Sequence, residues 1–318
     1  MAHELEFVNG KASMAYAGAL PWHGLGVEVP ADLTPVQMLD AANLNWRVEK
    51  VPAYAQIAGE NISIGKSALV RDRDNHILDV VSDDWNPVQN EDAFEFFNEF
   101  VMAGDMEMHT AGSLKGGQIV WGLAKVKESF ELFKGDQIDA YLLFSNFHKY
   151  GCSTDVRFTP IRVVCNNTLT LSLNSSVERM AKISHRKIFE PDNVKEMLGI
   201  ATDKLGKYKE MAQFLGSKKT KDEDIVEYFC RIFPVNSSSK KEKELSRNAQ
   251  IALDVLHSQP GAEYAEGSWW QPFNAVTYMT DHLVGRSADT RLTSAWYGAN
   301  KNLKTKALET AIEMAEAA

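Results

Sequence analysis

The stretch SNFHKYGCSTDVRFTPIRVVCNNTLTLSL, residues 145–173, contains the pattern that decides the fold. It predicts the end of one strand, a turn and a second strand. In the second strand, the apolar residues before Thr159 and those after Pro160 have opposite parity. Strand side chains alternate with a period of two, so we expect a bulge at Thr159-Pro160 that returns both apolar groups to one face. Arg157 and Arg162 would then share the opposite face.

The run Asn166-Asn167-Thr168 follows this strand. Short polar side chains of this kind cap helix N-termini, so a helix is expected to begin here. A basic strand face beside a helix N-terminus would form an anion site. From Leu173 onward the sequence predicts only helices, the longest of them starting at Pro191. Its apolar residues are spaced alternately by four and three from Val194 to Leu215, a seam that suits one partner helix, inside the domain or on another subunit.

The N-terminal half has strand patterns over residues 46–82 and 137–147, and a hairpin pattern over residues 106–126 with its turn at Gly116-Gly117. Two helices interrupt them, one capped by Thr34 and one over residues 90–102. Strands first and helices afterwards predict an α+β fold, with a mainly antiparallel sheet in the N-terminal half and a helical C-terminal half. We expect a sheet domain over residues 1–188 and a helical domain over residues 189–318.

Charge is distributed unevenly along the 318 residues, although the net charge of the whole chain is only -9. Residues 1–110 hold 6 Lys and Arg against 18 Asp and Glu, a net charge of -12, whereas residues 145–221 hold 14 against 7, a net charge of +7. The basic region could face an anionic partner. It could equally face the acidic region, within the fold or across an oligomer.

Several classes of protein are not expected from this sequence. The N-terminus lacks the basic and apolar regions of a signal peptide, and no apolar run is long enough for a membrane span. Cys152, Cys165 and Cys230 have no zinc-finger or paired spacing, which favours a reducing cytoplasm. Asp83-Asp84 lacks further clustered ligands, and the glycines of residues 106–126 lack a Walker pattern. We therefore expect no metal and no cofactor.

Five motifs, taken together, resemble those of a phage- and plasmid-borne family known only as a conserved domain of unknown function. They are residues 21–26 (PWHGLG), Val120-Trp121, residues 162–169 (RVVCNNTL), residues 274–277 (NAVT) and residues 296–298 (WYG). The resemblance covers most of the chain. It implies a mobile-element origin and a site of action in the cytoplasm of a bacterial host. It raises the expectation of a role in DNA metabolism, by analogy with neighbouring genes.

Our leading hypothesis is a single-stranded DNA-binding or annealing protein that acts in recombination or replication as a homo-oligomer. Arginines and aromatic side chains on one sheet face would follow phosphates and stack on bases. The small-sheet-plus-helix pattern is similar to that of single-strand annealing proteins. The candidate phosphate contacts are Lys149, Arg157, Arg162, Arg179, Lys182, Arg186 and Lys187. The candidate stacking residues are Tyr141, Phe147 and Tyr150.

Two alternatives come from other functional classes. An enzyme could use Cys152 with His148, or His23 as a base, but no third orienting group is evident. We therefore expect no catalytic residue. Trp22 beside His23 is interpreted as a packed glycine turn. A protein-binding module is the other alternative, inhibiting a host factor with an acidic N-terminal region that mimics DNA.

Overall fold

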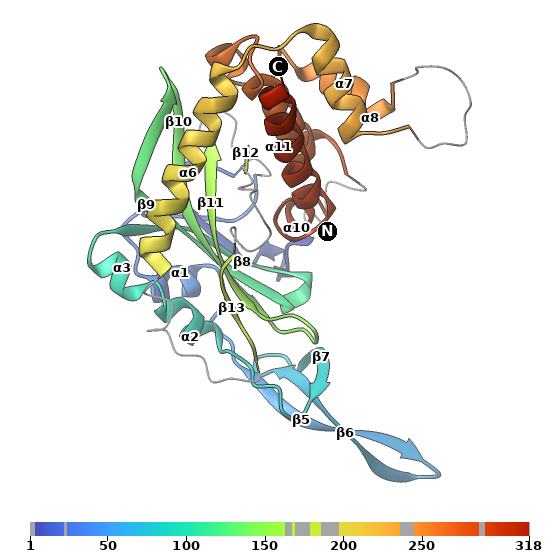
Figure 1. Ribbon diagram of the computed structural model, residues 1–318. Coiled ribbons are helices and arrows are strands. Elements are labelled where there is room, and N and C mark those ends of the chain that lie inside the picture. The colour runs from blue at the N-terminus through green and yellow to red at the C-terminus, as the bar shows by residue number, and fades with distance from the viewer. Residues whose placement is uncertain are drawn as a thin grey trace. The chain divides into compact units, whose positions relative to one another are not determined.

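The computed structural model describes residues 4–21, 24–162, 167–168, 179–185, 197–235, 245–285 and 290–317. Strands occupy most of the N-terminal half and helices the C-terminal half, so the predicted α+β class is confirmed (Figure 1). The chain forms two compact units. The first contains residues 1–127, 141–158 and 179–200, and the second contains residues 128–140, 159–178 and 201–318. The domain boundary expected at residues 188 and 189 lies outside the described residues.

The larger sheet is built on an antiparallel meander, with strand order β12-β11-β10-β9-β8-β3-β4 and β13 also paired to β11. Its strands are β3 (Met14–Ala17), β4 (Val27–Val29), β8 (Met106–Leu114), β9 (Ile119–Phe133), β10 (Asp136–Phe147), β11 (Thr154–Arg162), β12 (Asn167–Thr168) and β13 (Arg179–Ile183). A separate two-stranded ribbon contains β1 (Phe7–Val8) and β2 (Lys11–Ala12). The long strands β9 and β10 contribute residues to both units.

The hairpin expected over residues 106–126 is confirmed as β8 and β9. Its turn is a short helical turn, Lys115–Gly117, in which Gly116 and Gly117 have φ of 66° and 98°. These left-handed conformations favour glycine. Gly112 of β8 packs under Trp121, and a Cβ atom added at Gly112 would lie 2.3 Å from that ring. The two strands therefore approach closely because this position carries no side chain.

A second sheet, in the first unit, has the order β5-β6-β7. Its strands are β5 (Val48–Ile57), β6 (Glu60–Arg71) and β7 (His76–Ser82), which confirms the strand pattern read from residues 46–82. The β5–β6 turn contains Ala58 and Gly59, with φ of 51° and 89°. Positive φ at both central residues is the geometry of a type I′ turn, which matches the twist of the flanking strands.

Three short helices pack in the first unit. The first, α1 (Pro35–Ala41), begins with the predicted cap, in which Thr34 and Gln37 form a reciprocal capping box. The single helix expected over residues 90–102 is divided into α2 (Asn90–Glu95) and α3 (Asn98–Met102). Between them, Phe96 and Phe97 are buried, and their rings lie 5.0 Å apart edge to face. Aromatic packing thus fixes the break between the two helices.

One expectation for the central stretch is wrong. The chain is not helical throughout after Leu173, because Arg179–Ile183 forms β13 on the edge of β11. Pairing with an available strand edge outweighs local helix preference there. Asn167 and Thr168 form β12 and pair with Arg162 and Ile161 of β11, and residues 169–178, over which the expected helix would run, lie outside the described residues. The β11–β13 register is irregular between Val156 and Arg157 and ends there, so it does not test the bulge expected at Thr159-Pro160.

The second unit contains most of the helices. They are α6 (Met197–Ser217), α7 (Asp222–Ile232), α8 (Arg247–Val255), α9 (Trp270–Tyr278), α10 (Arg291–Tyr297) and α11 (Ala299–Ala317), with short turns η3 (Ala262–Ala265) and η4 (Met279–Leu283). In this unit Lys304 is fully buried, and its Nζ lies 2.8 Å from Oδ1 of Asp281. Among the described helices, none is both long enough and apolar enough to cross a membrane.

Candidate nucleic-acid interface

The long helix α6 is buried along one side by its own unit. Tyr208, Ala212 and Leu215 have no exposed surface, in agreement with the predicted apolar seam. The Tyr208 ring packs edge to face on Phe130 of β9 at 6.4 Å and on Trp270 of α9 at 6.3 Å. These three seam positions are therefore packed within the unit. The earlier part of the seam, residues 191–196 and the side chains of Leu198, Ala201 and Leu205, lies outside the described part of the structure.

Two lysines border the exposed side of α6, and each lies over a phenylalanine ring. Lys209 Nζ is 5.7 Å from the centroid of Phe130, and Lys218 Nζ is 5.5 Å from the centroid of Phe214. At about 100° per residue, Lys207 and Phe214 share a stripe with Lys218, whereas Lys209 lies on the other border. Both phenylalanines are half-buried. We call Phe130, Lys207, Lys209, Phe214 and Lys218 the α6 basic surface.

The charge around this surface is strongly positive. Six lysines occur between residues 204 and 221, against a single carboxylate, Glu210. Glu210 is exposed on the side of α6 that the lysine–phenylalanine pairs border. Lys219, just after the helix, donates to the backbone oxygen of Glu266 at 3.0 Å. The surface therefore offers cations next to aromatic faces, the combination that single-stranded nucleic acid requires.

The sequence placed these lysines within a basic region, but it did not single them out. Phe214 belongs to α6 itself, whereas Phe130 belongs to β9 and is brought beside α6 only by the fold. Recurrence of lysine between the seam positions of a helix is the pattern that could have indicated Lys207 and Lys218.

Two candidate residues, Lys149 and Tyr150, lie exposed in the turn between β10 and β11. Tyr150 is 54% exposed, and its backbone N–H donates to Oδ2 of Asp79 at 2.8 Å. Lys66 Nζ lies 5.7 Å from the centroid of the Tyr150 ring. The turn is thus anchored to β7 and presents Tyr150 to solvent, with Lys66 over its ring.

Three other candidate residues are not presented to solvent in this way. Tyr141 and Phe147 are buried in β10, at 5% and 9% exposure. Arg157 donates through Nε and Nη2 to Oδ2 of Asp155, at 3.0 Å and 2.6 Å. Because the ring faces are enclosed and the guanidinium is ion-paired, these three side chains contribute to the sheet's own packing.

The remaining candidates are described only in part or not at all. Arg162 belongs to β11, and Arg179 and Lys182 belong to β13, so their backbones lie in neighbouring strands. The side chains of these three residues are outside the described part of the structure. Arg186, Lys187, Trp22, His23 and Cys165 lie outside the described residues.

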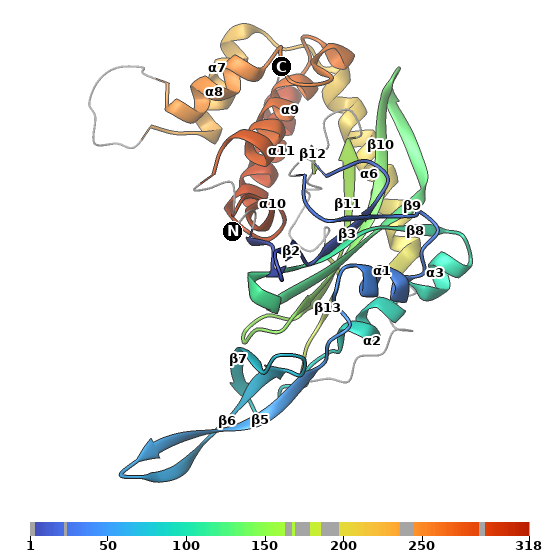
Figure 2. The ribbon, with the colours of Figure 1, turned by 180° about the vertical axis from the view of Figure 1, so that it is seen from behind.

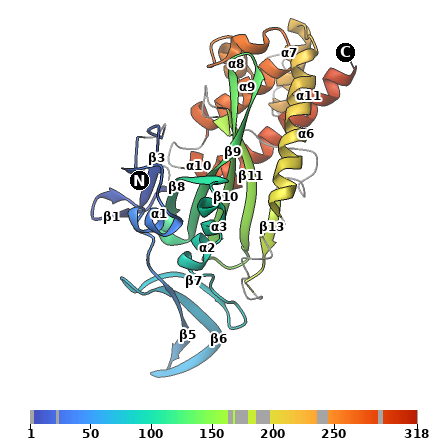
Figure 3. The same ribbon diagram turned by 90° about the vertical axis from the view of Figure 1, so that its left-hand side faces the viewer.

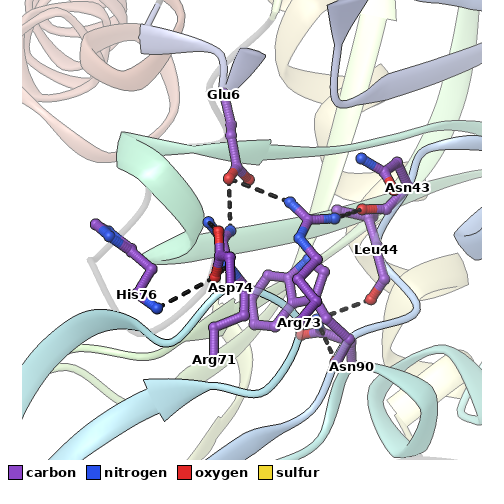
Figure 4. Close-up of polar contacts among 9 residues, drawn as sticks. Glu6, Asn43, Leu44, Arg71, Arg73, Asp74, His76 and Asn90 are labelled. Carbon is purple, nitrogen blue, oxygen red and sulfur yellow. Dashed lines mark hydrogen bonds and ion pairs between the residues drawn. The ribbon is translucent and has the colours of Figure 1, made fainter. Parts of the chain in front are cut away.

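Arginines elsewhere in the first unit are neutralised by carboxylates (Figure 4). Arg71 is buried, and its Nη1 donates to Oε1 of Glu6 at 2.5 Å, while Nε and Nη2 donate to the two oxygens of Asp74. Arg73 donates to the Asn43 backbone oxygen at 3.0 Å and lies 3.4 Å from Glu6. The pKa of Asp74 is lowered to about 2, mainly by its hydrogen bonds from Arg71. This cluster joins the N-terminal segment to β6, and its charges balance.

The guanidinium of Arg71 also lies 5.2 Å from the centroid of the Trp46 ring. The same ring contacts His148, which belongs to a second buried network. His148 is fully buried, its ring is 5.3 Å from Trp46, and its Nε2 is 3.0 Å from Oδ1 of Asn90. Desolvation, followed by the charges of His185 and Arg71, lowers the pKa of His148 to about 3. His148 is therefore neutral near physiological pH.

Histidine, cysteine and carboxylate side chains are the groups that could hold a metal ion. Among the described residues, no group of three or more His, Cys, Asp or Glu side chains is arranged to hold a metal ion. Asp83, considered above for its pairing with Asp84, accepts a hydrogen bond from the Ser67 hydroxyl at 2.7 Å and so belongs to the β6–β7 packing.

Comparison with known proteins gives a family and no activity. No curated protein and no solved structure was found to be similar to this chain. The model of one family, described as Domain of unknown function (DUF932), matches residues 77–296. The match includes β8 to β11 and all of α6, and it begins after the β5–β6 hairpin. Since this match covers more than half of the 318 residues, the chain belongs to the DUF932 family.

Proposed function

We propose that this protein binds single-stranded nucleic acid through the α6 basic surface. The observation that carries the proposal is the pair of lysine–phenylalanine contacts that borders the exposed side of α6, at 5.7 Å and 5.5 Å. Lysines can neutralise phosphates of a strand crossing the helix, while a half-buried phenylalanine offers a ring edge or face to an unpaired base. Lys149 and Tyr150 provide a second exposed lysine–aromatic pair in the other unit.

The aromatic component favours a single strand over a duplex. Bases within a duplex are already stacked on one another, so phenylalanine side chains would gain little from it. Binding driven by lysine and stacking alone has little sequence preference, which suits a protein that coats or anneals strands. We propose DNA annealing in recombination or replication as its role, in the cytoplasm of a bacterial host and on a mobile element.

The proposal is tested by replacing the charges and the ring separately. Lys207→Ala and Lys218→Ala, made singly, should each weaken binding of a labelled single-stranded oligonucleotide and lower the log–log salt slope by about 0.7. Phe214→Ala should cost roughly 1–3 kcal/mol with little change of slope. Lys11→Ala, at an exposed position of β2, is the matched control for loss of one lysine. Equal weakening by the control, or tighter binding of duplex than of single strand, would refute the proposed surface.

Two observations bear on the other functional classes. Burial and a pKa of about 3 make His148 unsuited to act as a general base for Cys152, so we do not propose a cysteine–histidine enzyme. The exposed apolar side chains of the β5–β6 hairpin favour a contact with protein. If no nucleic acid binds, a protein-binding module that inhibits a host factor becomes the leading proposal.

A further inference from the structure

A pocket of about 530 Å³ lies in the second unit. Its walls come from the segment just after α6, from α7, from Trp269 and from the C-terminal part of α11. In Figures 2 and 3, α7 lies beside α11, and the Tyr228 hydroxyl of α7 donates to the Ala307 backbone oxygen of α11 at 3.0 Å. Sites for small molecules have volumes of about 300–1,000 Å³, so this pocket has room for a ligand of that size.

The pocket begins where the α6 basic surface ends. Lys219 and Lys221 line it, directly after Lys218 of that surface. The backbone N–H of Trp269, another lining residue, donates to the Lys218 backbone oxygen at 3.0 Å. A single strand that lies on α6 and continues past Lys218 therefore meets the pocket.

The charges that line the pocket balance. Equal numbers of basic and acidic side chains contribute to its walls: Lys219, Lys221 and Arg231, and Asp224, Glu227 and Glu313. A free phosphate would meet the carboxylates as well as the cations, and a metal ion would meet the cations as well as the carboxylates. The lining therefore suits a neutral ligand that carries donors and acceptors together, and a nucleobase is a ligand of this kind.

Arg231 offers a flat surface for stacking. Its Nε and Nη2 atoms donate to Oε1 of Glu227 at 3.0 Å and 2.6 Å, and its Nη1 atom donates to Oε1 of Glu313 at 3.4 Å. These hydrogen bonds are made at the edge of the guanidinium, so they fix its plane and leave its faces for a base. Met314, which also lines the pocket, is half-buried and adds an apolar contact.

Asp224 and Lys221 supply polar groups that can read the edge of a base. Asp224, Glu227 and Arg231 are spaced by three and four residues along α7, so they lie on one side of the helix. The carboxylate of Asp224 accepts the Lys221 backbone N–H at 3.4 Å, and it has no other hydrogen-bond partner in the described part of the chain. An acceptor and a cation thus stand together near the stacking surface of Arg231.

We propose that this pocket binds an unpaired guanine base, which extends the proposed function and rests on it because the strand on α6 supplies the base. Of the four DNA bases, guanine has two adjacent N–H donors, at N1 and N2, beside the acceptor O6 on its Watson–Crick edge. Asp224 accepts from the two donors, Lys221 donates to O6, and the ring lies on Arg231. Thymine offers one N–H between two oxygens, which a carboxylate repels. The pocket therefore adds one preferred base to a surface that otherwise binds any sequence.

Base substitution in the strand tests the recognition of guanine. Fluorescence anisotropy compares labelled oligothymidines of about 15 nucleotides that carry one central guanine, hypoxanthine or thymine. The guanine oligonucleotide should bind about fivefold or more tightly than the all-thymine one, the effect expected of one bidentate contact. Hypoxanthine keeps O6 and the N1–H but lacks the N2 amine, so it should lose most of this gain.

A pair of variants tests the role of Asp224. Asp224→Asn keeps an acceptor for the Lys221 N–H, but its amide cannot accept from both guanine donors, so the guanine preference should disappear. Asp222→Asn is the matched control, because it removes the same charge from the same helical turn at an exposed position outside the pocket. The measured quantity is the ratio of guanine to thymine affinities, since the loss of a negative charge alone changes both affinities alike.

The outcomes separate the pocket from the α6 basic surface. Equal affinity for guanine and thymine oligonucleotides, undiminished binding of hypoxanthine, or the same ratio in Asp224→Asn and Asp222→Asn overturns the guanine pocket and leaves the surface in place. If no oligonucleotide binds, the surface is refuted, and free guanosine then tests the pocket alone. In equilibrium dialysis at millimolar guanosine, Asp222→Asn should bind the nucleoside and Asp224→Asn should not. Binding by neither variant, or by both equally, overturns the pocket as well.

Discussion

The Nε2 atom of His148 lies 3.0 Å from Oδ1 of Asn90, and this contact joins the end of β10 to the start of α2. The Asn90 amide nitrogen also donates to the backbone oxygens of Leu44 and Trp46, at 3.0 Å and 3.4 Å. One asparagine thus fixes a loop, a helix start and a buried histidine. The burial of His148 and the nearby charges of His185 and Arg71 keep its imidazole neutral.

Removing this asparagine should destabilise the first unit. Asn90→Ala removes the amide donor of the Leu44 and Trp46 oxygens and leaves the Nε2 atom of His148 with only the Asn146 amide, at 3.4 Å; each buried group that loses its partner costs about 1–3 kcal/mol. The expected result in urea unfolding is a loss of about 3 kcal/mol or more. Asn61→Ala, at an exposed position of β6, should change the stability little. Similar midpoints for the two variants would contradict the assigned role of Asn90.

Acid should destabilise the protein through His148. The pKa of this residue in the folded protein is about 3, below its ordinary value of 6.5, so the unfolded chain binds the proton more tightly. The stability that the neutral histidine contributes is complete above pH 6.5 and is lost as the pH falls toward 3. The slope should approach about 1.4 kcal/mol per pH unit.

Burial also lowers the pKa of His185, which adds to the loss in the same direction. His148→Gln keeps an amide donor for Asn90 and removes the titration. Its unfolding free energy, measured from pH 7 to 4, should therefore depend less on pH than that of the wild type. A wild-type stability that is flat over this range would contradict the burial of a neutral His148.

Two glycines should respond in opposite ways to alanine. At Gly112 the new Cβ would lie 2.3 Å from the Trp121 ring, so Gly112→Ala should destabilise the β8–β9 hairpin by about 1–3 kcal/mol or more. At Gly206 of α6 nothing lies within 4 Å of the added atom, so Gly206→Ala should stabilise the helix by up to about 1 kcal/mol. Thermal unfolding midpoints distinguish the two. A drop for both would show that α6 is packed at Gly206.

Cys152 should be dispensable for binding. It is half-buried in the turn after Tyr150, and its N–H donates to the backbone oxygen of Lys149. Cys152→Ser keeps the size and the backbone bond while removing thiolate chemistry. Binding of single-stranded oligonucleotide should stay within about twofold of the wild type. A loss of orders of magnitude would instead support a role for the thiol.

Local patterns predicted the elements that depend on neighbours in sequence. The Thr34 cap, the glycine turn between β8 and β9 and the seam of α6 were readable because each acts within a few residues. The strand β13 was missed because its partner, β11, lies more than twenty residues earlier and only the fold provides the edge. A basic segment on that edge was therefore interpreted as helix.

The candidate site was predicted less well for the same reason. Tyr141 and Arg157 had suitable chemistry, but the sequence did not show that β10 is covered on both faces or that Asp155 would hold the arginine. Conversely, Phe130 and Lys209 are 79 residues apart, and only folding brings the ring under the ammonium group. Side-chain availability depends on non-local packing, which residue types alone do not reveal.

The most direct test of nucleic-acid binding by α6 compares its exposed carboxylate Glu210 with a lysine of the α6 basic surface. Fluorescence anisotropy with a labelled single-stranded oligonucleotide, at about 50 mM and 200 mM salt, compares Glu210→Gln with Lys218→Ala. Both variants remove one charge, from α6 or from the residue just after it, yet we expect the first to bind more tightly and the second more weakly than the wild type. The Lys218→Ala slope against salt should fall by about 0.7. An absence of binding at the lower salt, or equal affinities for the two variants, would contradict the account.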